Sequence, residues 1–259
     1  MDDESLTDLL REAAEFGNCK DCVYVDSGHP LLCSACASRT LEPLAAPDAR
    51  CPVCDHPYRT PGDDCLNGPC NMGAANRGFE WNWSIAMRTG VLRQRIDDYK
   101  FRDRKGWGLI FGRILVGFLE THRDTFGSMD LLIPSPTYLG EGADRTWDHI
   151  GGIVEMAAQE QAPPGWPFVV HPPVIIKTVE TPSMAHLAHY KERKANAEGP
   201  LRDALQVSNP SKVRGKSIVV IDDVFTDGLT LREVARALRA AGAAAVYGVA
   251  LARQRYQGA

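Results

Sequence analysis

The chain of 259 residues has no apolar run that approaches the length of about 20 residues needed to cross a membrane. Its first residues, Met1 to Ser5, are acidic, and the basic start and apolar core of a secretory signal peptide are absent. Hydrophobic residues make up 44% and charged residues 24%, which is ordinary for a globular protein with a sizeable core. We therefore expect a cytoplasmic protein without membrane insertion, and its oligomeric state stays open.

Cysteine is missing from residues 71–259, because all eight cysteines are crowded into the amino-terminal part of the chain. They fall into two groups with matching first spacings: Cys19, Cys22, Cys33 and Cys36, then Cys51, Cys54, Cys65 and Cys70. Close cysteine pairs joined by a short loop can surround one zinc ion with four thiolates. The eight cysteines therefore predict two closed, structural zinc sites.

Disulfide bonding and redox catalysis fit these cysteines less well than zinc does. Disulfides are rare in proteins without a secretion signal, and several Cys-x2-Cys units are more than one redox site needs. The two zinc sites can be sequential or interleaved, and His56 can replace a cysteine in the second. We expect a short helix over residues 5–16 and then a double zinc-binding module that ends at residue 78. This module has few large apolar residues, so metal binding would supply its folding energy.

Net charge is −4 over the whole chain, but it is unevenly distributed. Residues 1–78 carry 13 acidic and 6 basic side chains, whereas residues 79–125 carry 6 acidic and 9 basic ones. Basic patches attract phosphate backbones, so the basic residues in 93–105 and 177–194 offer a nucleic-acid surface. Asp97, Asp98 and Asp103 interleave with the basic residues in 93–105, which favours a solvated, salt-bridged helix face instead.

Residues 216–232 carry the clearest functional pattern. Ile218 to Ile221 is an uninterrupted apolar run, typical of a strand buried on both faces, and it stops at Asp222 and Asp223. A short polar loop follows, and a helical apolar pattern then begins near Leu231. Strand, loop and helix in this order aim backbone N–H groups at one point beyond the carboxyl edge of the sheet. Such a point is an anion site.

The loop composition indicates which anion fits. Gly228 lets the backbone approach a ligand, and Thr226 and Thr230 offer hydroxyl donors to phosphate oxygens. Asp222 and Asp223 can accept hydrogen bonds from sugar hydroxyls and help to hold a divalent cation. Together these residues predict a site for a phosphorylated ribose. A buried strand followed by an acidic helix cap is the structural alternative.

The rest of the chain alternates between strand and helix patterns, which predicts a parallel sheet of the α/β class. We expect strands at residues 79–85, 130–134, 169–176 and 245–252, and helices at 89–99, 109–120 and up to about 159. The aromatic stripe in 79–85 favours a core role over base stacking. Residues 177–200 are polar and basic, and we expect them to be mobile.

Residues 219–230 resemble the phosphoribosyl-pyrophosphate (PRPP) binding motif of type I phosphoribosyltransferases: a hydrophobic strand, two acids, two residues, then Thr-Thr-Gly-x-Thr. The acid pair, Thr226, Gly228 and Thr230 match this motif. Asp227 stands where the family usually has threonine, and Leu229 is larger than the usual small residue. With the amino-terminal cysteines, the whole order resembles the ComF family, whose phosphoribosyltransferase-like members carry zinc ribbons and are linked to competence and DNA uptake.

The resemblance implies a type I phosphoribosyltransferase-like domain over residues 79–259, with PRPP and Mg²⁺ as ligands. It implies that Arg145, in the Arg145–His149 segment, and Arg193, spaced from Asn196 as in the family, face pyrophosphate. Together with Asp222 and Asp223 they are the candidate catalytic residues. The PRPP contacts it implies are Asp222, Asp223, Thr226, Asp227, Gly228, Leu229 and Thr230.

Three hypotheses follow for the function. The first is an enzyme that transfers a phosphoribosyl group between pyrophosphate and a nitrogen nucleophile, with no acceptor indicated. The second is a weak or inactive ComF-like accessory factor in DNA uptake, which senses PRPP or a nucleotide or acts through single-stranded DNA or protein partners. The third is a zinc-stabilised α/β protein without a small-molecule site.

Overall fold

A computed structural model describes residues 41–60, 62–143, 145–161 and 165–255. Cys19, Cys22, Cys33 and Cys36, and the helix expected at 5–16, lie outside the described residues. Across the part of the chain that is described, no helix combines the length and the apolar character needed to cross a membrane.

The centre of the fold is a parallel sheet of four strands in the order β1-β6-β5-β2. The strands are β1 (Asn82–Met87), β2 (Leu131–Pro134), β5 (Ser217–Phe225) and β6 (Ala245–Arg253). Phe168 forms a single parallel bridge with Leu132 and so extends the sheet beyond β2. The middle of β5 is completely buried, as its unbroken apolar run predicts. Consecutive strands run parallel, so helical crossovers connect them.

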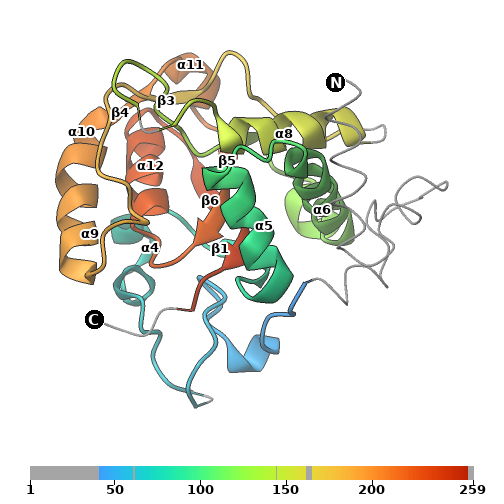
Figure 1. Ribbon diagram of the computed structural model, residues 1–259. Helices are drawn as coiled ribbons and strands as arrows, with labels where there is room; N and C mark the ends of the chain where they lie inside the picture. The colour runs from blue at the N-terminus through green and yellow to red at the C-terminus, as the bar shows by residue number, and fades with distance from the viewer. Residues whose placement is uncertain (1–40, 61, 144, 162–164, 256–259) are drawn as a thin grey trace.

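Helices cover both faces of this sheet (Figure 1). Val219 and Ile221 of β5 pack with α5 (Gly90–Phe101), α6 (Trp107–Thr121) and α8 (His149–Glu160) in one hydrophobic cluster. Ile218 and Val220 face the opposite way and pack with α12 (Leu229–Ala240) in a second cluster. The alternation of β5 side chains thus gives two cores. The predicted fold class, a parallel sheet flanked by helices, is confirmed.

Residues 175–207 form a separate layer that packs against α12. Its antiparallel strands are β3 (Ile175–Lys177) and β4 (Leu205–Val207), and between them lie α9 (Tyr190–Asn196), the π-helix η3 (Ala197–Leu201) and α10 (Arg202–Ala204). Figure 1 shows α9 and α10 beside α12. Arg202 binds Glu233 of α12 at 2.8 Å, and Glu198 binds Arg232 at 2.8 Å. Within residues 177–200, the structure is helical from Tyr190 to Leu201, and Glu198 ties this part to α12. The expected mobility of the segment stays a prediction.

The remaining elements are short. They are η1 (Pro47–Ala49), η2 (Gly68–Asn71), α4 (Ala74–Arg77), α7 (Arg123–Phe126) and α11 (Pro210–Val213). The aromatic stripe of β1 belongs to the core, as predicted: Trp81 and Trp83 stack with their ring centroids 4.9 Å apart, and Phe126 meets both edge-on.

The crossing of α6 and α8 depends on a glycine. A Cβ on Gly112 would lie 2.7 Å from the backbone nitrogen of Ala157 and 2.9 Å from the Met156 Cβ. We predict that Gly112→Ala pushes the helices apart and lowers the free energy of unfolding by about 1–3 kcal/mol. Urea denaturation measures this change. Gly199→Ala, where a Cβ meets nothing within 4 Å, is the control and should shift stability by less than about 0.5 kcal/mol. Equal losses in both variants would contradict the packing argument.

Candidate functional site

Strand β5 does not end at the acid pair, Asp222 and Asp223, as the sequence predicts, but continues to Phe225. The reason is that β6 runs alongside it to the end, pairing Asp222 with Ala250 and Phe225 with Arg253. The acid pair therefore lies within the last part of the ladder, where the backbone holds it rigidly.

The 226–228 loop, Thr226 to Gly228, connects β5 to α12. Gly228 has a φ of 80°, which favours glycine, and a Cβ there would lie 2.7 Å from the Phe225 ring. The glycine thus allows the chain to turn tightly above the Phe225 ring and start α12 at Leu229. As predicted from the strand–loop–helix order, the helix amino terminus lies at the carboxyl edge of the sheet.

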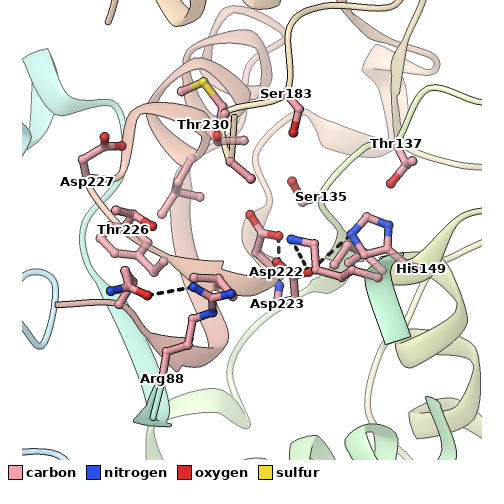
Figure 2. A pocket seen from close by; sticks show the side chains of 18 of the residues that line it. Arg88, Ser135, Thr137, His149, Ser183, Asp222, Asp223, Thr226, Asp227 and Thr230 are labelled. Carbon is pink, nitrogen blue, oxygen red and sulfur yellow. Dashed lines mark hydrogen bonds and ion pairs between the residues drawn. The ribbon is translucent and has the colours of Figure 1, made fainter. Parts of the chain in front are cut away.

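A cleft of about 670 Å³ opens at this edge. Figure 2 shows Thr226, Asp227 and Thr230 along one side of it, with Ser135, Thr137 and His149 on the other. The structure brings most of the predicted site residues to this one cleft: Arg145, Arg193, Asp222, Asp223, Thr226, Asp227, Gly228 and Thr230. Leu229 does not line it, because its side chain is buried.

Asp223 is enclosed by a lysine and a histidine from two distant elements. Lys100, in the last turn of α5, places its Nζ 2.7 Å from Asp223 Oδ2, and both side chains are largely buried. His149 Nε2 lies 3.3 Å from the same oxygen. Asp148 caps α8 by accepting a hydrogen bond from the Gly151 N–H, which fixes His149 in the first helical turn.

These contacts shift the pKa values of the two carboxyls of the acid pair in opposite directions. Burial disfavours the charged form of Asp223, but the charge of Lys100 and the hydrogen bond from His149 outweigh it and hold the Asp223 pKa well below its usual range. Burial and the negative charge of Asp223 raise the pKa of Asp222 to about 7. Burial also lowers the pKa of His149, which is therefore a neutral donor near pH 7. Asp223 thus carries the stable negative charge of the pair.

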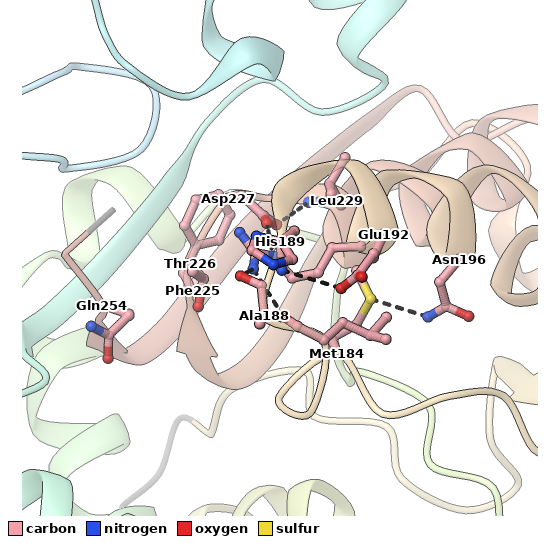
Figure 3. A network of polar contacts seen from close by, with 12 residues as sticks. Met184, Ala188, His189, Glu192, Asn196, Phe225, Thr226, Asp227, Leu229 and Gln254 are labelled. Carbon is pink, nitrogen blue, oxygen red and sulfur yellow. Dashed lines mark hydrogen bonds and ion pairs between the residues drawn. The ribbon is translucent and has the colours of Figure 1, made fainter. Parts of the chain in front are cut away.

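Asp227, labelled in Figure 3, forms a second ion pair at the cleft with Arg193. The Nε of Arg193 lies 2.7 Å from Asp227 Oδ2, and both side chains are largely buried. Arg193 also donates to the carbonyl oxygens of Leu187 and Ala188 at 3.0 and 2.9 Å. The other oxygen of Asp227 accepts a hydrogen bond from the Leu229 N–H at 3.2 Å. Asp227 thus caps the start of α12 and is neutralised by Arg193.

Arg145 lies on the opposite side of the cleft. Its Nη1 donates to the Lys100 carbonyl at 2.8 Å, and its guanidinium stacks 5.1 Å from the Phe101 ring centroid. Neither interaction involves a carboxylate, and Arg145 is in none of the ion pairs between described residues. The predicted role of Arg145 and Arg193 in facing pyrophosphate stays a prediction.

Sequence reasoning missed the partners of the acid pair. Lys100 is one of several cations in a run of basic and acidic residues, and His149 is one residue of a polar segment. No sequence pattern near either residue indicated a contact with the acid pair. Ser135, which hydrogen-bonds Asp222 through its side chain, follows the predicted strand 130–134. That position at a strand end was the one available hint.

The described cysteines form a cluster, which we call the cysteine cluster: Cys51, Cys54, Cys65 and Cys70. Their sulfurs all lie within 4.8 Å of one another, and those of Cys54 and Cys65 are 3.6 Å apart. Four thiolates at about 2.3 Å from one zinc ion stand about 3.8 Å from each other, so this donor set fits a tetrahedral zinc site. The cluster consists of four cysteines that follow one another in the sequence, as a sequential arrangement of the sites requires. It does not include His56.

The acid pair leads to a prediction of pH dependence. A carboxyl with a raised pKa stabilises the folded state at low pH and loses that contribution as pH rises through its folded pKa, which is about 7 for Asp222. We predict that wild type loses on the order of 2 kcal/mol between pH 5 and pH 8 from this group. Asp222→Asn should remove this loss, as urea unfolding at both pH values will measure.

Asp223→Asn is the matched variant. It leaves Lys100 buried without its anion and should lower stability by about 3 kcal/mol at pH 7. The contribution of a carboxyl with a lowered pKa is present above its unfolded pKa and is lost only in acid, so this cost should persist at pH 8. Identical pH profiles for the two variants would contradict the division of the pair.

The cysteine cluster predicts a zinc stoichiometry. Cys65→Ala should lose one equivalent of zinc relative to wild type and unfold at lower temperature, since the cluster keeps only three ligands. Elemental analysis of purified protein measures the loss. His56→Ala changes a buried neighbour outside the cluster and should keep the wild-type zinc content; zinc loss in this control would make His56 a ligand.

A family model described as the phosphoribosyl transferase domain matches residues 175–258. This range covers β3 to β6 and contains the acid pair, the 226–228 loop and α12. Comparison with curated proteins finds no match. The chain thus carries a phosphoribosyltransferase-like domain, with a cluster of four cysteines near its amino-terminal side.

Proposed function

We propose that the cleft binds PRPP or a related ribose 5-phosphate compound. The observation that carries this proposal is that the acid pair and the 226–228 loop line the same cleft, at the carboxyl ends of β5 and β2. Thr226 and Thr230 face the place where a 5′-phosphate would meet the helix amino terminus. Asp222, half-buried and lining the cleft, would accept hydrogen bonds from the ribose hydroxyls.

Mg²⁺ is the cofactor that the resemblance implies. Asp223 is tied to Lys100, so Asp222 is the member of the pair that would contact the ion. Such ions are held by one or two carboxylates together with substrate phosphates, and this donor set fits that arrangement. When bound, Mg²⁺ would neutralise charge on the pyrophosphate.

Transfer of the phosphoribosyl group is the reaction this ligand allows. The bond between C1 of the ribose and a pyrophosphate oxygen breaks, pyrophosphate leaves with the electron pair, and a nitrogen nucleophile bonds to C1 and releases a proton to solvent. Arg145 would stabilise the departing pyrophosphate with a charge-assisted hydrogen bond. The acid pair would hold the ribose in position.

The accessory role stays a prediction from the resemblance to the ComF family, as do single-stranded DNA, DNA-uptake proteins and the cytoplasmic location. The cations of residues 93–105 do not favour a nucleic-acid surface, because most are paired with aspartates. The boundary at residue 78 and a second zinc ion, on Cys19, Cys22, Cys33 and Cys36, also stay predictions.

Ligand binding is testable by calorimetry with PRPP and Mg²⁺. Wild type should bind with a micromolar Kd, and Thr226→Val should weaken binding about tenfold because one hydroxyl donor to phosphate is lost. Asp227→Thr removes a negative charge and releases Arg193, so it should tighten binding by about tenfold. Thr121→Val alters a hydroxyl that bonds Gly117 within α6 and should change nothing. Folded wild-type protein that takes up no PRPP would refute the proposed function.

A further inference from the structure

Arg253, the last residue of β6, is completely buried beside the 226–228 loop. The two N–H groups of its Nη1 are shared among three backbone carbonyl oxygens, those of Phe225 at 2.8 Å, Thr226 at 2.6 Å and Gln254 at 2.6 Å. The same guanidinium stacks 5.1 Å from the Phe225 ring centroid. Figure 3 shows Phe225 and Thr226 between Gln254 and Asp227. Arg253 therefore fixes the backbone from which the 226–228 loop starts.

The other end of this guanidinium contacts the cysteine cluster. Nη2 of Arg253 donates to the Sγ of Cys54 at 3.4 Å, and Asn67 donates to the same sulfur at 3.1 Å. Cys54 is itself completely buried. One planar side chain thus touches both the loop of the candidate ligand site and a candidate zinc ligand.

The charge of Arg253 requires a partner. A buried guanidinium without a counter-charge is costly, yet among the described residues Arg253 forms no ion pair with a carboxylate. The nearby Asp55 is committed elsewhere, since it binds Arg50 at 3.1 Å and accepts a hydrogen bond from the Ser84 N–H at 2.7 Å. At its other end the guanidinium contacts the sulfur of Cys54, which is anionic when it ligates a metal.

A metal makes that sulfur a fitting partner. Four thiolates around one divalent ion leave a net charge of about −2, and N–H donors to the sulfurs are the usual way such centres are stabilised. The guanidinium of Arg253 offsets part of this charge. Without the metal, nothing holds the four sulfurs around one point, so Cys54 is free to move away and Arg253 loses this contact.

We propose that Arg253 couples the cysteine cluster to the ligand cleft. The metal-bound Cys54 thiolate holds the guanidinium, the guanidinium holds the carbonyls of Phe225 and Thr226, and these set the loop that would receive the 5′-phosphate. This inference rests on the proposed function for the identity of the ligand. Its consequence is reciprocal: the metal raises the affinity for the ligand, and the ligand raises the affinity for the metal by the same factor. We expect the more tightly held metal to leave more slowly. Arg253 is a positioning residue, since it acts through the loop.

The test measures transfer of zinc from the full chain to a chromophoric chelator, with and without saturating ribose 5-phosphate. The zinc to be followed is the ion bound by the cysteine cluster, which is identified as the equivalent of zinc that is missing from Cys65→Ala. Ribose 5-phosphate should slow its release from wild type about tenfold. Arg253→Gln should release zinc faster and should show no retardation, even at ribose 5-phosphate concentrations at which calorimetry shows the variant saturated. A retardation in Arg253→Gln equal to that of wild type would overturn the proposal.

A second pair of variants tests the coupling independently, in case Arg253→Gln folds poorly. Cys54→His and Cys70→His both keep four zinc ligands and lower the thiolate charge equally, but only the first removes the sulfur that Arg253 contacts. With zinc retained in both, Cys54→His should weaken ribose 5-phosphate binding about tenfold more than Cys70→His. Equal affinities would overturn the coupling.

The proposed function and the coupling fail in different ways. If wild type binds no ribose 5-phosphate, the proposed function fails, and hydrogen exchange decides the coupling alone. Exchange of the 225–231 amides should then be faster in Arg253→Gln with zinc still bound, and Arg253→Lys should restore part of the protection. Unchanged protection in Arg253→Gln would overturn the coupling as well.

Discussion

The buried ion pair between Lys100 and Asp223 is the interaction on which the cleft depends. Two adjacent carboxylates at the end of a buried strand repel each other, and burial disfavours the charge of both. Lys100 resolves this conflict by stabilising the charge on Asp223, which leaves the pKa of Asp222 raised to about 7. The same contact ties the last turn of α5 to the end of β5. A single ion pair therefore sets both the electrostatics of the cleft and the position of one of its sides.

Charge matching recurs at each side of the site. Asp227 is neutralised by Arg193, and the guanidinium of Arg253 faces the Cys54 sulfur. Buried pairs of this kind contribute little net stability, but removing one member leaves an uncompensated charge. The charged side chains around the cleft thus depend on one another, since each buried charge needs its partner. An anionic ligand that enters it must bind beside these pairs or exchange partners with them.

The local patterns of the sequence were sufficient to predict the parallel sheet and the loop that follows β5. The apolar run at Ile218–Ile221, the helical period after Leu231 and the cysteine spacing each reflect interactions between near neighbours in the chain, and the fold class and the described cysteine cluster followed from them. The partners of Asp223 could not follow, because Lys100 and His149 reach it from distant elements. The same limit applies to the ion pair between Glu198 and Arg232, which are 34 residues apart in the chain and which no local pattern joins. The strand end at Phe225 depended on the partner strand β6.

The departure of Asp227 from the phosphoribosyltransferase motif is compensated within the chain. Its carboxylate accepts a hydrogen bond from the Leu229 N–H and pairs with the Arg193 guanidinium. These are the two kinds of contact that a phosphate takes at a helix amino terminus. Asp227 therefore already occupies part of the donor set that the motif supplies to a ligand, and Leu229 contributes its backbone rather than its side chain. Under the proposed function, a 5′-phosphate would either displace this carboxylate or bind beside it at Thr226 and Thr230. The strength of one internal ion pair would then set the affinity of the site.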